Sequence, residues 1–320
     1  MNFYLHIGYP KTASTFLQQV IFPKLKNCNV LDKDKYEIRY QILYKIITLD
    51  EVEFNDNKKK IINLLHQEVK KINKTNKIIL SWPGITNPIK FHTKDNYFSN
   101  DINRTILRLN EIFSNIGEVK LILIIRNYTD LIESFFYQVR HLLKFKFKDE
   151  DLIKALKKED KKNKKLLEAF CFSKIINLCL NNNINNSVIL YEDLSNNTFN
   201  FQNSLADVLD NEEIKDLNFL DLVKIRKNTR DEKKKIIYKI KKSFSVLSIK
   251  KIKNILNYKF ISNISYRFSL IKKIFSEKQN INIKKKNYNQ LVSYYFNQDY
   301  NDLPQNIKQQ CKRYNYINLK

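Results

Sequence analysis

Short stretches of continuous apolar residues predict strands that are buried on both faces. Four of them are rich in β-branched or aromatic side chains: 2–7 (NFYLHI), 77–81 (KIILS), 119–125 (VKLILII) and 187–191 (SVILY). Segments with apolar residues at helical spacing lie between them: 15–25, 58–72 and 129–144. Continuous apolar strands are typical of parallel sheets covered on both sides. The alternation predicts an α/β fold with a doubly wound parallel sheet and helices on both faces.

The rest of the chain is expected to extend this core without forming a second domain. Residues 145–185 are rich in charge and predict a helical insertion. Beyond about residue 230 the strand signals stop, and 231–320 is expected to be a helical C-terminal extension. Neither an internal repeat nor a Pro/Gly/Ser-rich linker interrupts the sequence. We therefore expect one domain, 1–320, with its α/β core in 1–230.

The charge is strongly basic, with 58 Lys and Arg against 33 Asp and Glu and a formal net charge of +25. Such a balance attracts polyanions, but an excess of this kind also arises as an ordinary solvated surface. Residues 232–257 combine a helical apolar face with flanking lysines. This segment predicts either a peripheral contact with a membrane surface or a helix packed on the core, and both interpretations stay open. No zinc-finger spacing or aromatic–basic RNA signature points to a specific nucleic acid.

Cysteine spacing and hydropathy predict a metal-free protein of a reducing compartment. The four cysteines, Cys28, Cys171, Cys179 and Cys311, have no metal-ligand spacing. The N-terminus lacks a signal-peptide pattern, and no uncharged apolar stretch approaches 18 residues. We expect a cytoplasmic location.

The first strand is followed by a stretch that predicts an anion site. In "HIGYPKTASTFLQQ", Lys11 lies three positions after Gly8. Three hydroxyl residues follow Lys11: Thr12, Ser14 and Thr15. A loop that leads from a strand into a helix offers unpaired N–H groups at the positive end of the helix dipole. A single hydroxyl residue suffices to cap a helix, so one lysine with three hydroxyls favours a phosphate cradle of the P-loop type.

The spelling differs from the nucleoside triphosphate pattern G-x-x-x-x-G-K-[ST]. Lys11 follows Gly8 by only three positions, and Pro10 precedes it. The third strand ends in Arg126, whereas a kinase needs an acidic residue at a strand end for Mg²⁺. A guanidinium binds phosphate directly with two parallel donors, and Ser134 on the following helix is close enough to assist.

These motifs resemble those of PAPS-dependent sulfotransferases, where PAPS is 3′-phosphoadenosine 5′-phosphosulfate. "GYPKTASTFLQ" resembles the family's 5′-phosphosulfate loop, and "RNYTDLIESFFYQ" its 3′-phosphate motif. "VILYEDLSNNTFNFQNSLADVL" is similar to the family's later strand and helix. The three occur in the family's order and span roughly the first two-thirds of the chain.

The resemblance implies a role for each matching residue. Lys11 would contact the oxygen that bridges phosphate and sulfate, and the 5′-phosphate would be held by Thr12, Ala13, Ser14 and Thr15. Arg126 and Ser134 would bind the 3′-phosphate, and Tyr191 would lie near the adenine. "KIRKNTR" is similar to a loop that closes over the 3′-phosphate, which makes Arg226 and Lys227 further candidates, although Asn228 replaces the family's glycine.

Several positions depart from the family pattern. Trp82 and Pro83 stand where a general base is expected, so His92 is the candidate base, with His141 and Glu133 as alternatives. Tyr128 replaces a proline. Ala13 replaces a common glycine, and we expect ordinary helical or bridge backbone angles there.

The sequence thus predicts a sulfotransferase that needs no metal, with PAPS as donor, PAP (adenosine 3′,5′-bisphosphate) as product and a small molecule or glycan as acceptor. Two alternatives stay open. One is a P-loop small-molecule kinase, which would require Mg²⁺. The other is a non-enzymatic protein that binds polyanions through its basic surface, with steep salt dependence.

Overall fold

The protein is described by a computed structural model that covers residues 1–9, 11–31, 34–72, 75–86, 101–142, 153, 156–157, 167–223 and 285–317. The chain forms two compact units, Met1–Leu217 with Tyr288–Lys320, and Asn218–Asn287. Only the ends of the second unit fall within the described ranges. The basic segment 232–257 lies outside them, as does the boundary expected near residue 230. The single-domain expectation stays a prediction.

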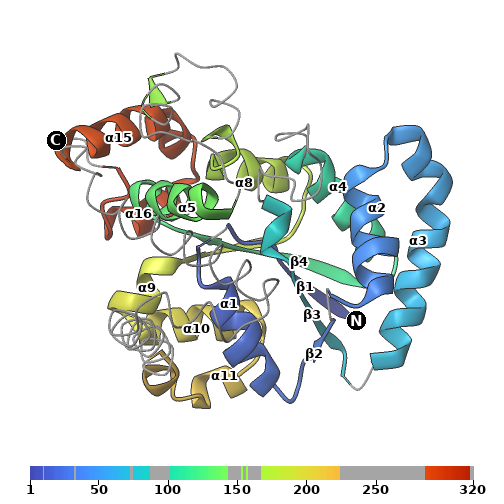
Figure 1. Ribbon diagram of the computed structural model, residues 1–320. Coiled ribbons are helices and arrows are strands. Elements are labelled where there is room, and N and C mark those ends of the chain that lie inside the picture. The colour runs from blue at the N-terminus through green and yellow to red at the C-terminus, as the bar shows by residue number, and fades with distance from the viewer. Residues whose placement is uncertain are drawn as a thin grey trace, which may run out of the picture. The chain divides into compact units, whose positions relative to one another are not determined.

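A parallel sheet of five strands forms the centre of the first unit (Figure 1). Its strands lie in the order β2–β3–β1–β4–β5, with these bounds: β1 Asn2–His6, β2 Asn29–Val30, β3 Lys77–Ser81, β4 Glu118–Ile125 and β5 Asn186–Leu190. The four strands predicted from apolar runs are confirmed within one residue at each end. β1 pairs with β3 and β4 on its two sides, and the last pair between β4 and β5 joins Ile125 to Leu190.

Helices cover both faces of this sheet, which confirms the predicted fold class. Figure 1 shows α5 and α8 on one side and α1 and α10 on the other. The helical elements are α1 Ser14–Phe16, η1 Leu17–Ile21, η2 Phe22–Lys24, η3 Glu37–Leu43, α2 Tyr44–Thr48, α3 Glu51–Ile72, η4 Pro83–Thr86, α4 Ile102–Ser114, α5 Tyr128–Leu142, α8 Phe172–Asn181, α9 Tyr191–Asn196, α10 Thr198–Val208, α11 Glu213–Asp216, α15 Lys285–Asn301 and α16 Gln305–Lys312. The expected helical character of the C-terminal region is confirmed by α15 and α16.

The strand order brings the predicted motifs to one edge of the sheet. Because the strands are parallel, their carboxyl ends share an edge, and ligands of such folds bind there. The β1 loop (residues 7–13) and the end of β4 at Arg126 are adjacent at this edge, since β1 and β4 are neighbours. The chain leaves β1 into α1 below the sheet and leaves β4 into α5 above it (Figure 1). The two loops therefore leave this edge toward opposite faces of the sheet.

Two glycines give room for close packing at the ends of the central strands. A Cβ at Gly8 would lie 2.7 Å from Nε2 of His6, and one at Gly117 would lie 2.2 Å from the carbonyl oxygen of Met1. The described glycines all have φ outside the left-handed region. These two glycines are therefore needed for space and not for a left-handed backbone.

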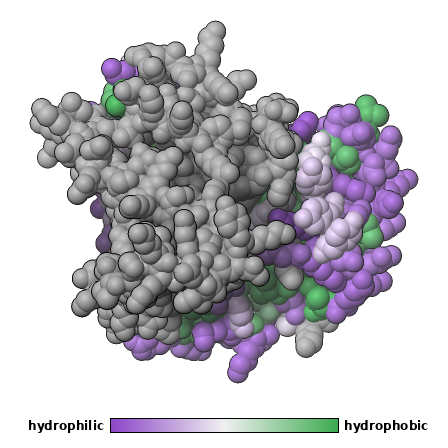
Figure 2. Space-filling view, viewed as in Figure 1, coloured by the Kyte–Doolittle hydropathy of each residue, from purple (hydrophilic) through white to green (hydrophobic). Residues whose placement is uncertain are grey.

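The long helix α3 shows how the basic surface is built. Its buried side chains, Phe54, Ile61, Leu65 and Val69, recur at helical spacing, with the buried carboxylate of Glu68 among them. The lysines lie on the other faces, and this side of the molecule is mainly hydrophilic in Figure 2. The five lysines of α3 thus lie on the solvated back of an amphipathic helix.

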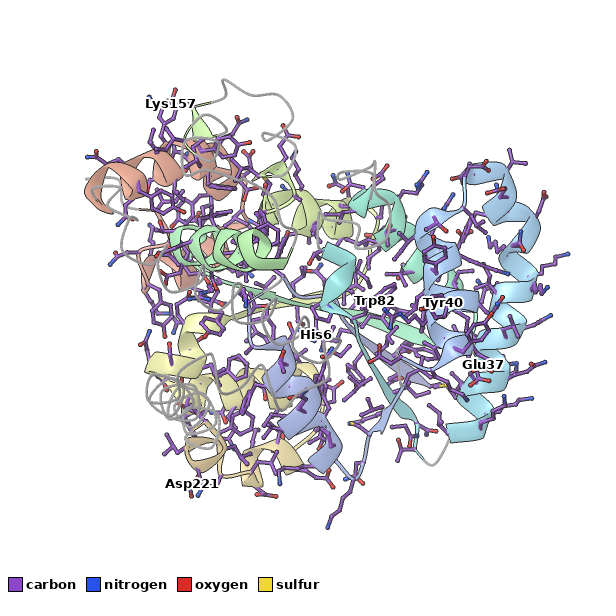
Figure 3. All side chains as sticks on the ribbon, viewed as in Figure 1. His6, Glu37, Tyr40, Trp82, Lys157 and Asp221 are labelled. Atoms are coloured by element: carbon purple, nitrogen blue, oxygen red, sulfur yellow. The ribbon has the colours of Figure 1, made fainter. Side chains whose placement is uncertain are left out.

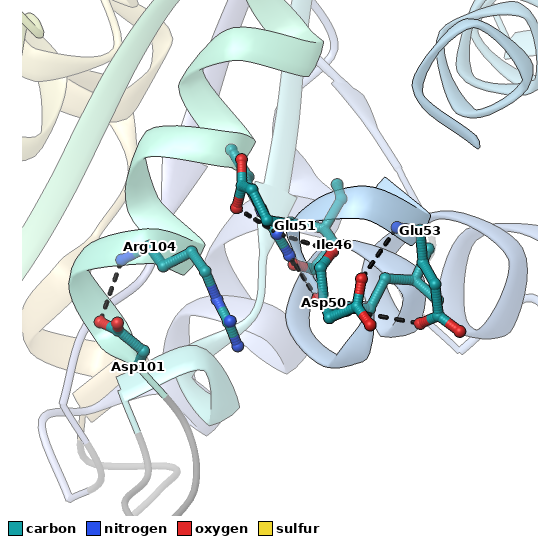
Figure 4. A network of polar contacts seen from close by, with 8 residues as sticks. Ile46, Asp50, Glu51, Glu53, Asp101 and Arg104 are labelled. Carbon is teal, nitrogen blue, oxygen red and sulfur yellow. Dashed lines mark hydrogen bonds and ion pairs between the residues drawn. The ribbon is translucent and has the colours of Figure 1, made fainter. Parts of the chain in front are cut away.

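A buried arginine, Arg108, joins α4 to the end of α2, and its partners Ile46, Asp50 and Glu51 are labelled in Figure 4. The side chain of Arg108 is 3% exposed and donates to the carbonyls of Ile46 and Leu49 at 3.3 and 2.7 Å. Its other nitrogen reaches the carbonyl of Asp50 and the carboxylate of Glu51 at 3.0 and 2.7 Å. The guanidinium thereby satisfies carbonyls that a helix leaves unpaired at its C-terminus.

Within the described ranges, no helix has both the length and the apolar character that crossing a bilayer would need.

Candidate functional site

The β1 loop has an unusual backbone at two residues that flank Thr12. Lys11 and Ala13 have φ of 69° and 64°, in the left-handed region that side chains other than glycine rarely adopt. The expectation of ordinary backbone angles at Ala13 is wrong: with ψ of 11°, this residue is left-handed and directly precedes α1. Each such residue costs about 1 kcal/mol or more, and such strain often marks a binding loop. Turns of this kind direct successive N–H groups into a concavity that suits anions.

The three hydroxyls of the loop have different surroundings. The hydroxyl of Thr12 is buried and donates to the Tyr9 carbonyl at 2.5 Å, so it holds the loop in shape. The hydroxyl of Ser14 is buried and has no hydrogen-bond partner among the described residues. Thr15 is exposed one position further on. A buried hydroxyl without a partner at a helix N-terminus is an available donor for an anion.

Arg126 brings the end of β4 against the β1 loop. Its NH1 donates to the Lys11 carbonyl at 3.1 Å, and the guanidinium carbon lies 4.6 Å from the ring centre of Tyr191. Its NH2 lies 3.9 Å from the carboxylate of Asp130, which is largely exposed. Nε of Arg126 is buried and has no partner in the described part of the chain. The guanidinium thus retains donor capacity at the carboxyl edge of the sheet.

Tyr191, expected as the last residue of its strand, lies one residue past the strand end, because β5 stops at Leu190 and Tyr191 begins α9. Its ring stacks with Arg126, a favourable contact between a cation and an aromatic face. The structure therefore joins three predicted site residues, Lys11, Arg126 and Tyr191, from three separate segments of the chain.

The other predicted residues are distributed as follows. The Lys11 side chain is exposed, and Ser134 lies half-buried on α5, about two turns from its start. The candidate base His92 lies outside the described residues, and so do Arg226 and Lys227. Their roles stay predictions.

His6 lies beneath the β1 loop and is fully buried, beside the end of β3 where Trp82 follows (Figure 3). Its Nδ1 is 2.7 Å from the hydroxyl of Ser81, and Gln18 donates to that hydroxyl at 3.0 Å. Nε2 faces Gly8 and has no partner among the described residues. Burial lowers the pKa of His6 to about 4, so the ring is neutral at pH 7. Because it is fully buried, it supports the loop and is out of reach of an acceptor.

This buried imidazole predicts a specific loss of stability in acid. An unfolded histidine has a pKa near 6.5, above the folded value of about 4. Its contribution is therefore complete above pH 6.5 and is lost as the pH falls toward 4. Between pH 7 and pH 5 the wild type should lose about 2 kcal/mol more of its unfolding free energy than His6→Asn.

Urea denaturation at the two pH values measures this difference. His66→Asn is the matched control, because His66 is exposed on α3 and should leave the wild-type pH dependence unchanged. Parallel pH dependences for the wild type and His6→Asn would show that His6 is not a buried neutral group.

Tyr128, which replaces the proline of the family motif, is an anchor of the core. Its ring stacks between Phe172 and Phe296, with centroids 4.6 Å away on each side. Its hydroxyl donates to the buried carboxylate of Asp299 on α15. Asp299 also accepts from the N–H groups of Phe172 and Ser173 at 2.8 and 3.1 Å. The start of α5, which follows Arg126, is thereby fixed to α8 and α15.

Sequence reasoning missed the roles of two acidic residues after β5. The buried carboxylate of Glu192 accepts from the N–H of Asn127 at 2.8 Å and from the hydroxyl of Tyr316 at 2.6 Å. Burial raises the pKa of Glu192. Asp193 accepts from the hydroxyl of Tyr314. The motif letters Y-E-D marked the position, but the partners lie about 120 residues further along the chain. In the described ranges, no three His, Cys, Asp or Glu side chains gather into a group able to hold a metal ion.

Comparison with known proteins gives one structural likeness and no sequence match. The sequence matches no described protein family and no curated protein. Among solved structures, the chain is similar to a sulfotransferase from Alicyclobacillus acidocaldarius, with a TM-score of 0.43 and 10% sequence identity. The likeness covers 65% of this chain and 80% of that one.

Proposed function

We propose that this protein is a sulfotransferase that moves the sulfuryl group of PAPS to a hydroxyl or amine of an acceptor and releases PAP. One observation carries the proposal: the Arg126 guanidinium lies against the β1 loop at Lys11 and stacks on Tyr191. A guanidinium, the β1 loop and an aromatic ring thus meet at the carboxyl edge of the sheet. A nucleotide with one charged group on each side of its ribose needs this combination of contacts.

In this proposal the β1 loop holds the 5′-phosphosulfate. The N–H groups at the start of α1 and the unpartnered Ser14 hydroxyl donate to the phosphate, and exposed Thr15 adds a second hydroxyl. Lys11 supplies a full charge to the bridging oxygen. Arg126 binds the 3′-phosphate with two of its nitrogens, with Ser134 as a second donor, and Tyr191 lies beside the adenine.

The chemistry follows from where the charge develops. The acceptor oxygen or nitrogen attacks sulfur, the bond between sulfur and the bridging oxygen breaks, and PAP leaves with the electron pair on its phosphate. Lys11 and the loop N–H groups stabilise that developing charge, as donors do in an oxyanion hole. A base takes the proton of the acceptor. His92 remains our candidate for this base, and a glycan or small molecule remains our candidate acceptor.

A kinase is the second candidate, because a lysine and hydroxyls in a strand-to-helix loop also suit nucleoside triphosphates. The geometry after β5 favours the first candidate. Glu192 and Asp193 stand at a strand end, where a kinase holds Mg²⁺, but their carboxylates are engaged by Asn127 and two tyrosines.

Calorimetric titration of the wild type separates these candidates. We expect PAP to bind in the presence of EDTA, with ATP at least about tenfold weaker with or without Mg²⁺, since the loop and Arg126 match two separate phosphates. Preference for ATP with Mg²⁺ would establish the kinase. Binding of any duplex DNA with steep salt dependence, and no preference for PAP, would favour the polyanion-binding alternative.

A further inference from the structure

We propose that residues Arg313–Tyr316, which we call the C-terminal brace, position Arg126 for the second phosphate of the nucleotide. The inference rests on the proposed function. It adds a specific role for a segment that follows the last helix and lies outside every motif in the sequence. Its basis is a set of hydrogen bonds that join the brace to the ends of β4 and β5.

Beyond the sheet, the ends of β4 and β5 remain linked to each other. The β4–β5 ladder ends at the pair Ile125 and Leu190, so Arg126 and Tyr191 are the first residues past it. One bond continues the alignment, from the N–H of Asn127 to the Glu192 carboxylate at 2.8 Å. The position of the guanidinium, one residue before Asn127, therefore depends on what holds Asn127 and Glu192.

The brace holds both of these residues. The side-chain amide of Asn127 donates to the carbonyls of Tyr314 and Asn315 at 3.3 and 2.9 Å. The hydroxyl of Tyr316 donates to the second oxygen of Glu192 at 2.6 Å. The Glu192 carboxylate thus connects Asn127, on one oxygen, to the brace, on the other.

The hydrogen bond between Glu192 and Tyr316 is buried. Glu192 and Tyr316 are 8% and 2% exposed, and the Tyr316 ring meets the ring of Tyr128 edge-on with centroids 6.3 Å apart. A second attachment lies beside it, where Asp193 accepts from Tyr314 and lies 3.8 Å from Arg313. A buried carboxylate that loses a donor rearranges or takes up a proton, and either change alters the position of Asn127.

Tyr316→Phe tests the brace, because it keeps the ring and removes the hydroxyl that binds Glu192. We expect PAP binding to weaken by about five- to tenfold, while AMP, which lacks the 3′-phosphate, binds within about twofold of the wild type. Calorimetric titration with PAP and with AMP gives both values. Tyr314→Phe is a second test with the same expected direction. Tyr300→Phe is the matched control, since its hydroxyl meets the carbonyl of Lys308 at 3.4 Å, away from both strand ends.

The outcomes separate the brace from the proposed function. A wild type that does not bind PAP overturns the proposed function and the brace with it. Normal PAP binding in the wild type and in both variants overturns the brace alone. Equal losses for PAP and AMP also overturn it, because they indicate general destabilisation, which thermal unfolding of each variant would reveal.

Discussion

Replacing Arg126 with alanine should weaken the binding of PAP about 100-fold, because two charge-assisted hydrogen bonds to one phosphate are lost. AMP carries only the 5′-phosphate, so its affinity should stay within about threefold of the wild type. Arg126→Lys should recover only part of the loss, since an ammonium group does not offer two parallel donors. Titration of each variant with both nucleotides measures these differences.

Lys11→Ala should weaken the binding of PAP and AMP alike, unlike Arg126→Ala, which should weaken PAP alone. It removes a charge from the β1 loop, which in our proposal faces the 5′ end of either nucleotide, so PAP and AMP should both weaken by about tenfold or more. The matched control is Lys24→Ala, an exposed lysine at the end of the same helical segment with the same change in net charge. A loss for PAP alone in Lys11→Ala, or for both nucleotides in Arg126→Ala, would show that the two residues do not bind separate phosphates.

The sheet could be predicted because its strands are long, apolar and parallel. The apolar runs coincide with β1, β3, β4 and β5. A parallel strand that is covered on both faces must be almost entirely apolar, so its sequence is easy to recognise. β2 was missed because it contains only Asn29 and Val30, which is too short for any periodicity to appear. The helix expected at 15–25 is present over 14–24, but as consecutive α, π and 3₁₀ turns that a repeat of 3.6 residues does not distinguish.

Part of the site could be predicted for the same topological reason. Residues that directly follow parallel strands lie at one edge of the sheet, which places Arg126 and Tyr191 near the β1 loop. In the structure, Arg126 contacts both the Lys11 carbonyl and the Tyr191 ring. Ala13 was misjudged because its left-handed backbone is imposed by the turn into α1, and alanine carries no local signal for it. The contacts of the brace could not be predicted from the sequence, because Tyr316 and Glu192 are 124 positions apart and only tertiary packing joins them.

Removal of the Asp299 carboxylate should cost more stability than any other substitution considered for this chain. Asp299 is buried and accepts hydrogen bonds from the hydroxyls of Tyr128 and Ser173 and from two N–H groups at the start of α8. The N-cap residue of α8, Cys171, makes no side-chain cap of its own, so Asp299 performs that role from another helix. In Asp299→Ala, these buried donors lose their acceptor together.

We expect Asp299→Ala to lose about 3–5 kcal/mol of unfolding free energy in urea, a large share of the stability of an ordinary domain. Asp299→Asn should lose less, because its carbonyl still accepts from one hydroxyl and one N–H group, and the hydroxyl beside its amide can turn to accept. Asp302→Ala is the matched control. Asp302 is exposed just past the same helix, so this change should stay within about 0.5 kcal/mol of the wild type.

A loss in Asp299→Ala no larger than in the control would mean that water replaces the carboxylate and that α15 does not anchor the start of α5. The expected loss has a functional consequence, since α5 begins two residues after Arg126 and its first residue, Tyr128, is held by Asp299. Asp299→Asn, if folded at 25 °C, should therefore bind AMP normally and PAP less tightly. The support for the guanidinium would then extend from the brace into the buried contact between α5, α8 and α15.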